Sequence, residues 1–234
     1  MPTYEPLAEI LRPSDLVDFV GQNHLLESDK PIGKSLADKQ FHSMILWGPS
    51  GVGKTTLARI ICSQMGAHFE QMSAVLGGIK EFRNVIEHAD LYKQHNKNTI
   101  LFVDEIHRFN KAQQDAFLPH IESGLITLIG ATTENPSFEI NSSLLSRVRV
   151  YVLDKLSDND LKVIAKRALD RQKTTLKEDG SLSLIIDNSD GDARRLINII
   201  EQLTEKSKAT LSKEDIAKTL QSKVSNFDKG GDIY

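Results

Sequence analysis

Residues 48–55, which read GPSGVGKT, constrain this chain more than any other stretch. They match the phosphate-binding pattern G-x-x-x-x-G-K-[ST] at every fixed position. An apolar run precedes them at residues 44–47, and apolar residues at helical spacing follow them from residue 56 to residue 65. Strand, glycine turn and helix are the context in which backbone N–H groups and a helix N-terminus converge on one phosphate group. The stretch therefore predicts a binding site for a nucleoside triphosphate.

Individual residues of this loop carry specific expectations. Lys54 is expected to reach the β- and γ-phosphates, and the Thr55 hydroxyl is expected to bind Mg²⁺. The nearest match to the guanine-reading pattern N-K-x-D, at residues 96–99, lacks the acid and precedes the carboxylate strand described next, so guanine specificity is not expected. The other loop residues predicted to contact the nucleotide are Pro49, Ser50, Gly51, Val52, Gly53 and Thr56.

A second motif lies at residues 99–105, TILFVDE. Its continuous β-branched and aromatic run predicts a strand buried on both faces, as in a parallel sheet. Two carboxylates end this strand, and ligands bind at the carboxyl ends of parallel strands. Asp104 fits an acid that holds Mg²⁺ through water, and Glu105 fits a base that orients the attacking water. No Cys or His stands at metal spacing from the nearby His107, so a zinc site is not expected.

Strand and helix patterns alternate up to residue 153, which predicts an α/β doubly wound parallel sheet. From residue 154 the pattern predicts a small helical domain, with capping pairs at Ser157/Asp160 and Ser212/Asp215. Further strands are predicted at 67–75, 125–133 and 150–153, helices at 79–92, 110–122, 181–188, 193–206 and 216–221, and a loop at 27–35. The predicted domains are an α/β nucleotide-binding domain at 1–153, a helical domain at 154–223 and a tail at 224–234.

The composition excludes several classes of protein. A formal net charge of −3 over 234 residues gives no overall attraction to nucleic acid, so DNA binding would need a local basic patch or residues outside this sequence. The single cysteine, Cys62, cannot form an internal disulfide, which suits a reducing cytosol, and a buried thiol is expected. No apolar run of membrane-spanning length and no signal-peptide core are present. We therefore expect a cytoplasmic protein that does not bind membranes.

Several motifs, in this order and spacing, resemble AAA+ ATPases of the clamp-loader-related branch: GPSGVGKTT, ILFVDE, IGATTEN, LLSRVRV and GDARRLIN. Longer stretches, FVDEIHRFNKAQQDAFLP, GATTENPSFEINSSLLSRVRVYVL and FDKGGDIY, resemble the replication-associated recombination protein A (MgsA) family, whose eukaryotic relative is the Werner-helicase-interacting ATPase. The likeness covers nearly all 234 residues. It implies an AAA+ P-loop αβα sandwich followed by a helical lid. The family's C-terminal oligomerisation region is expected to follow FDKGGDIY, so the chain is interpreted as the ATPase module alone.

The resemblance also implies roles for further residues. Thr133 matches sensor 1, with its neighbour Thr132 as the weaker alternative. Arg147 matches the arginine finger that reaches the ATP of an adjacent subunit; a surface charge is the alternative. Arg194 matches sensor 2 on the lid, and only one of Arg194 and Arg195 can face the nucleotide. The stretches 11–13 and 19–21 resemble the adenine-side wall, in which the nucleotide-contacting residues are Arg12, Pro13, Val20 and Gly21, with Ile197 of the lid as a closing residue.

As a function, the resemblance implies an ATP- and Mg²⁺-dependent, DNA-dependent ATPase acting at stalled or gapped replication forks. Its implied partners are double- and single-stranded DNA, a single-stranded DNA-binding protein and further copies of itself, as a tetramer at full length, in a nucleoid-associated cytoplasmic setting. A clamp-loader-type subunit and a protein-remodelling AAA+ ATPase are the alternatives. The loop at residues 74–79 lacks the aromatic residue typical of protein-threading machines, which counts against the second alternative.

DNA contact has two candidate regions. Lys80 and Arg83 begin the helix that faces DNA in the clamp-loader relatives. The stretch 155–177 carries seven basic and three acidic side chains, for which a solvated helix face is the favoured interpretation.

Overall fold

The computed structural model describes residues 4–75, 78–205 and 210–228. The chain divides into two compact units, one formed by residues 13–154 and the other by residues up to Arg12 together with those from Lys155 onward. We call them the α/β unit and the helical unit. The sequence pattern predicts residues 1–12 in the α/β domain, but Leu7 packs in the helical core. The reason is a long-range contact: the Glu201 carboxylate accepts the Leu7 N–H at 2.7 Å and the Tyr4 hydroxyl at 2.8 Å.

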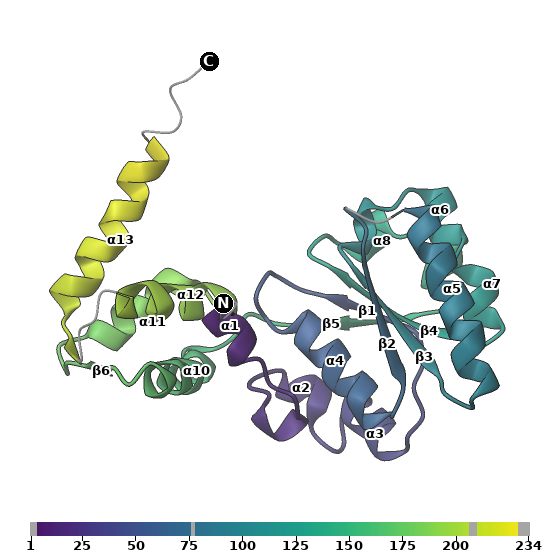
Figure 1. Cartoon of the computed structure of the whole chain (residues 1–234), viewed down its shortest axis with the longest axis horizontal. Coiled ribbons are helices and arrows are strands. Elements are labelled where there is room, and N and C mark those ends of the chain that lie inside the picture. The colour runs from purple at the N-terminus through teal and green to yellow at the C-terminus, as the bar shows by residue number, and fades with distance from the viewer. Residues whose placement is uncertain (1–3, 76–77, 206–209, 229–234) are drawn as a thin grey trace. The chain divides into compact units, whose positions relative to one another are not determined.

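The α/β unit is built on a five-stranded sheet of order β2-β3-β4-β1-β5. Every neighbouring pair is parallel, so all carboxyl ends lie at one edge (Figure 1). Met44 and Phe102 both align with Ile129, which places β1 and β3 on either side of β4. The strands are β1 (Met44–Trp47), β2 (His68–Ser73), β3 (Thr99–Asp104), β4 (Ile126–Thr132) and β5 (Arg149–Val152). The predicted parallel sheet and its edge strand near residue 150 are confirmed.

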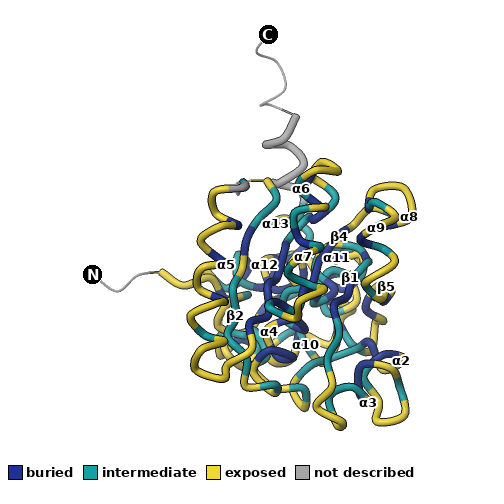
Figure 2. The backbone as a smooth tube through the Cα atoms, turned by 90° about the vertical axis from the view of Figure 1, so that its right-hand side faces the viewer, coloured by how far each residue is buried: buried dark blue, intermediate teal, exposed yellow. Residues whose placement is uncertain are grey.

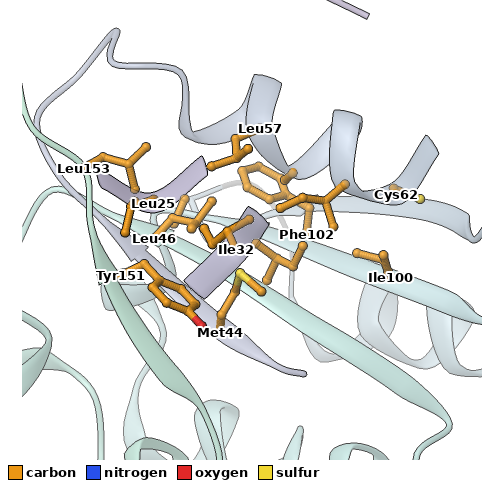
Figure 3. Packing of buried hydrophobic residues seen from close by; sticks show 14 of the residues in the cluster. Leu25, Ile32, Met44, Leu46, Leu57, Cys62, Ile100, Phe102, Tyr151 and Leu153 are labelled. Atoms are coloured by element: carbon orange, nitrogen blue, oxygen red, sulfur yellow. The ribbon is translucent and has the colours of Figure 1, made fainter. Parts of the chain in front are cut away.

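Alternate residues of the central strands enter separate cores on the two faces of the sheet. Leu46 and Phe102 pack with Leu57 of α4 on one face (Figure 3), and Ile45 and Leu101 belong to a cluster with α5 and α7 residues on the other. Figure 2 shows β1 and β4 as buried strands. The helical elements of this unit are η1 (Leu16–Asp18), α2 (Asn23–Leu26), α3 (Pro31–Ala37), α4 (Lys54–Gln64), α5 (Ile79–Gln94), η2 (Ile106–Arg108), α6 (Lys111–Asp115), α7 (Leu118–Glu122), α8 (Pro136–Glu139) and α9 (Ser142–Leu145).

Two local predictions in this unit are wrong. The loop expected at residues 27–35 contains α3, in which Pro31 occupies the first turn and Ile32 is fully buried. The single helix expected at residues 110–122 is two short helices, with Pro119 in the first turn of the second. A proline lacks the N–H that a helix interior uses but fits a first turn, so the helix restarts there.

The helical unit packs α1 (Leu7–Ile10), α10 (Asp158–Arg171), α11 (Ser181–Ser189), α12 (Ala193–Thr204) and α13 (Lys213–Asp228) around Leu161, Ile185, Leu196 and Ile200. Both predicted capping pairs form, at Ser157/Asp160 and at Ser212/Asp215. The structure adds a parallel pair of two-residue strands, β6 (Thr175–Leu176) and β7 (Thr210–Leu211), where the sequence pattern predicts only helices. Helix α13 continues past the predicted residue 221, and the last six residues of the tail, 229–234, lie outside the described residues.

Cys62 is buried, and burial raises the pKa of its thiol to about 11. The thiol therefore stays protonated at neutral pH, as expected of a structural cysteine. Among the described residues, no helix is long and apolar enough to cross a membrane.

Candidate nucleotide-binding site

The predicted phosphate loop connects β1 to α4 at the carboxyl edge of the sheet. Gly51 has φ +65° and Gly53 has φ +100°, in the left-handed region that favours glycine. A Cβ on Gly48 would lie 2.3 Å from the carbonyl oxygen of Leu153, and one on Gly53 would lie 2.7 Å from the Phe19 ring. The loop is therefore a cradle that only glycine at these positions can form.

The N-terminus of α4 opens onto this cradle. The helix starts at Lys54, and its N-cap, Gly53, provides no side chain to hydrogen-bond the first turn. The N–H groups of a first turn have no partner within their own helix and carry its positive dipole end. Glycine cradle and helix N-terminus together suit a phosphate group, with Thr55 and Thr56 in the first turn.

Lys54 is folded back into its own loop. It is 8% exposed, and its Nζ donates to the carbonyl oxygens of Gly48 and Pro49, each at 2.7 Å. Two backbone carbonyls of the cradle thus hold the ammonium. The loop is also tied to the sheet, because the Gly48 N–H donates to the Thr132 carbonyl at 3.1 Å.

The two predicted carboxylates lie where β3 ends. Asp104 is the last residue of β3, and Glu105 follows it with φ +53°, an uncommon conformation for a residue with a side chain. The Glu105 Oε2 atom lies 3.2 Å from His107 Nδ1, and the Glu105 side chain is one-third exposed. The Thr55 hydroxyl and the Asp104 carboxylate provide oxygen ligands, the type that Mg²⁺ prefers.

The predicted sensor position follows β4. Thr132, the last residue of β4, is fully buried, and its Oγ1 lies 2.9 Å from His107 Nδ1 and accepts the Glu134 N–H at 3.0 Å. Thr133, the residue predicted as sensor 1, follows the strand and is exposed. The Thr132 hydroxyl is therefore engaged by protein groups, and the Thr133 side chain is open to solvent.

Arg147 lies just after α9 on the surface of the α/β unit. Its Nε is 2.5 Å from Glu122 Oε1 of α7, and its Nη1 donates to the Ser143 carbonyl at 2.8 Å and to Ser146 Oγ at 3.0 Å. The predicted arginine finger is thus held by a carboxylate of its own chain.

Gln22 is a site-adjacent residue that sequence reasoning missed. It follows Val20 and Gly21, is 6% exposed, and exchanges two hydrogen bonds with the backbone of Asp154, at 2.8 and 3.0 Å. These two hydrogen bonds tie the segment that ends with Val20 and Gly21 to the end of the α/β unit. A buried glutamine at this point has no local sequence signal.

The predicted lid residues belong to the helical unit. Arg194 and Arg195 lie in the first turn of α12 and are both exposed, while the Arg195 N–H donates to the capping Asp192 carboxylate at 2.8 Å. Arg12 lies beside α1, where the Glu9 carboxylate accepts its Nε and Nη2. Ile197, expected to close the nucleotide site, is buried in the helical core.

The candidate DNA contacts lie on exposed surface. Lys80 and Arg83, in the first turns of α5, are both exposed. In the stretch 155–177, Lys155 pairs with Asp190 at 2.8 Å. Residues 76 and 77 of the loop at 74–79 lie outside the described residues.

The chain matches two protein families. Residues 44–155 match the ATPase family associated with various cellular activities (AAA), and residues 170–234 match the AAA C-terminal domain. It is 48% identical to replication-associated recombination protein A of Coxiella burnetii, over 98% of this chain and 54% of that protein. It is 45% identical to the protein of the same name of Escherichia coli K12, over 99% of this chain and 55% of that protein. It is 40% identical to ATPase WRNIP1 of Dictyostelium discoideum, over 99% of this chain and 30% of that protein. The chain belongs to the AAA ATPase family, in the branch of these relatives.

Solved structures agree with this assignment. A single-residue mutant of Thermotoga maritima RuvB superposes with a TM-score of 0.77 at 28% identity, over 91% of this chain and 73% of that one. The T. maritima RuvB Holliday junction branch migration motor gives a TM-score of 0.72 at 28% identity, over 91% of this chain and 72% of that one. The predicted α/β P-loop fold with a helical domain after it is confirmed. The chain spans about half the length of the replication-associated recombination proteins that it matches.

His107 is a second residue near the candidate site that sequence reasoning missed. The sequence pattern gives it no role, since a zinc site is not expected there, and no cluster of metal-ligating side chains occurs within the part of the chain that the structure describes. The structure instead places its ring between the ends of two neighbouring strands, β3 and β4. The only sequence signal for this placement is that His107 lies two positions after the acidic pair Asp104 and Glu105.

Proposed function

We propose that this chain binds ATP with Mg²⁺ in the loop between β1 and α4 and hydrolyses it at the edge where β3 and β4 end. The observation that carries the proposal is the cradle: Gly48 and Gly53 have no space for a Cβ, and Gly51 and Gly53 have positive φ, at a helix N-terminus that no side chain caps. Such a loop directs backbone N–H groups at phosphate oxygens.

Lys54 would provide the positive charge of the binding step. Its ammonium bonds two neutral carbonyls of its own loop, both at 2.7 Å. A hydrogen bond between two charged groups is about twice as strong as one with a neutral partner. A triphosphate therefore competes well for this ammonium, which would exchange loop carbonyls for phosphate oxygens.

Mg²⁺ would be held by the Thr55 hydroxyl and, through water, by Asp104. When bound, the metal ion neutralises charge on the phosphates. Glu105 would orient the attacking water and take its proton as the water oxygen bonds to the γ-phosphorus and the bond to the ADP oxygen breaks. The products are ADP and inorganic phosphate.

Three further residues would complete the site. Thr133 would contact the γ-phosphate side, and Arg194 would approach the same nucleotide from the helical unit. Arg147 would act on the nucleotide of a neighbouring subunit, a contribution worth roughly 10³–10⁵ in rate, or about 4–7 kcal/mol of barrier. This proposal ties hydrolysis to self-assembly.

The test is Glu105→Gln, which removes the base and keeps the size of the side chain. We expect unchanged affinity for a fluorescent ATP analogue and at least about 100-fold slower phosphate release. Glu87→Gln, an exposed change on α5, is the control and should hydrolyse at the parent rate. Normal turnover by Glu105→Gln would show that the base lies elsewhere.

We also propose that ATP hydrolysis here serves DNA transactions in replication-linked recombination, at stalled or gapped forks. Support comes from relatives named replication-associated recombination protein A and from the fold shared with a Holliday junction branch migration motor. The proposal includes double- and single-stranded DNA, a single-stranded DNA-binding protein and a homo-oligomer, a tetramer at full length, as partners in a nucleoid-associated cytoplasmic setting.

Forked, gapped, duplex and single-stranded DNA, each added to the ATPase reaction, test this second proposal. We expect forked or gapped DNA to stimulate the rate most. The Lys80→Glu/Arg83→Glu double variant should lose stimulation and flatten its salt dependence. Lys93→Glu/Lys97→Glu, with Lys93 in the last turn of α5 and Lys97 just past its end, should not. Absence of stimulation by every DNA would favour a protein-remodelling role instead.

A further inference from the structure

One histidine joins the ends of two strands at the proposed reaction site. His107 Nδ1 lies 2.9 Å from Thr132 Oγ1, at the end of β4, and 3.2 Å from Glu105 Oε2, just past the end of β3. The histidine side chain is 9% exposed and Thr132 is fully buried. The three side chains therefore form a compact group in which His107 and Thr132 are shielded from water and Glu105 is one-third exposed.

The partners determine which atom carries the proton. Thr132 Oγ1 accepts the Glu134 N–H at 3.0 Å and has the Glu134 carbonyl 3.3 Å away as the acceptor for its own hydrogen. The Glu105 carboxylate accepts only. If His107 Nδ1 carried a lone pair, that lone pair would face the carboxylate. Nδ1 therefore carries the proton and donates it to Thr132 Oγ1, and Glu105 Oε2 lies in polar contact with the same nitrogen at 3.2 Å.

The backbone of Glu105 is also constrained. Its φ of +53° is a conformation that costs of order 1–3 kcal/mol for a residue with a side chain, and it persists only where the surroundings impose it. The contact with His107 is one such constraint. It engages Oε2, and the other carboxylate oxygen, Oε1, has no hydrogen-bond partner among the described residues.

We propose that His107 is a positioning residue for ATP hydrolysis: its Nδ1–H donates to Thr132, which keeps the protonated nitrogen 3.2 Å from Glu105 Oε2, holds that oxygen beside the end of β4 and leaves Oε1 to bind the attacking water. The inference rests on the proposed function, because it requires Glu105 to be the base. A base oriented by a third group is a recurring arrangement in enzymes. Without His107 the carboxylate rotates freely, so the fraction of time in the productive geometry falls.

The experiment compares variants that keep or lose a donor at the Nδ1 position. The side-chain amide of asparagine reaches about as far as Nδ1, whereas that of glutamine reaches about as far as Nε2. We expect His107→Leu and His107→Gln to lower kcat about 10–100-fold, with KM and the dissociation constant for ATP within about twofold of the parent chain. His107→Asn should keep kcat within about threefold. A purely structural role would give asparagine and glutamine equal effects.

The exposed His95, changed to Leu, Asn and Gln, provides the control set and should leave kcat unchanged. If His107→Leu fails to fold, as judged by circular dichroism, the Asn and Gln variants decide the question. The inference is overturned if His107→Asn and His107→Gln have equal kcat, or if His107→Leu keeps the kcat of the parent chain. In both cases Glu105→Gln would still be inactive, so the proposed function would stand. Normal hydrolysis by Glu105→Gln, or none by the parent chain, refutes the proposed function itself.

Discussion

Two cations of the α/β unit, Lys54 and Arg147, are held in opposite ways. Lys54 is 8% exposed and bonds two neutral carbonyls of its own loop. The Arg147 side chain is 38% exposed and bonds the Glu122 carboxylate, itself 52% exposed. One cation is enclosed by backbone, and the other is paired with a charged side chain on the surface.

The difference indicates what each cation can serve. An enclosed ammonium that bonds carbonyls of its own loop suits an anion that enters the same loop, because the anion outcompetes those carbonyls. An exposed guanidinium faces outward, and an exposed ion pair contributes only about 0–1 kcal/mol, so a partner molecule can displace Glu122 at low cost. The first geometry suits the proposed binding within the chain, and the second suits the proposed contact with another chain.

The largest expected effect comes from Lys54→Ala, which should abolish detectable ATP binding because it removes the cationic side chain of the phosphate loop. Isothermal titration calorimetry with ATP and Mg²⁺ measures it directly. Lys39→Ala, at an exposed lysine before β1, is the matched control and should bind like the parent chain. If Lys54→Ala still bound ATP, the enclosed ammonium would not be a phosphate-binding group, and the contrast drawn between Lys54 and Arg147 would fail.

Arg147→Ala should leave the affinity for ATP unchanged and lower the ATPase rate by about 10³-fold or more under assembling conditions. The sharper test mixes Arg147→Ala with Lys54→Ala. Each variant is inactive alone, but a mixed interface pairs an intact phosphate loop with an intact arginine, so activity should return. A mixture with no more than the summed rates, together with a parent rate per chain that does not depend on concentration, would contradict a role between subunits.

Local patterns explain why the elements that form much of the candidate site could be predicted. The phosphate loop, the acidic end of β3 and both helix-capping pairs depend on residues that lie within a few positions of one another in the sequence. The prediction of a loop at residues 27–35 failed because Pro31 and Gly33 were interpreted as loop formers. Gly33 is instead required for close packing in α3, since a Cβ there would lie 2.1 Å from the Glu27 carbonyl oxygen.

Features that depend on long-range contacts were not predictable. Residues near Leu7 join the helical unit through Glu201, which lies 194 positions further along the chain. The His107 contact with Thr132 spans 25 positions and depends on the register of β3 and β4. A single sequence carries neither the partner nor the register, so only the folded structure brings these side chains together.

Gly53→Ala tests how tightly the phosphate loop around Lys54 is packed. A Cβ at Gly53 would both adopt φ +100° and lie 2.7 Å from the Phe19 ring, so we expect a loss of about 2–3 kcal/mol in the free energy of unfolding and weaker ATP binding. Gly66→Ala separates the two causes: its φ is +60° but no atom lies within 4 Å, so it should cost only about 1–2 kcal/mol. Equal losses in urea denaturation would mean that Phe19 moves aside freely.

The smallest expected effect is that of Glu122→Gln, which removes the charge that holds Arg147. Because the pair is exposed, the free energy of unfolding should change by less than about 1 kcal/mol. The arginine loses its competing carboxylate, so the ATPase rate at limiting protein concentration should rise by about two- to threefold, and the salt dependence of that rate should weaken. Glu139→Gln, an exposed glutamate of α8, serves as the control. A lower rate would show that Glu122 orients Arg147 for its partner, and the surface pair would then be part of the working site.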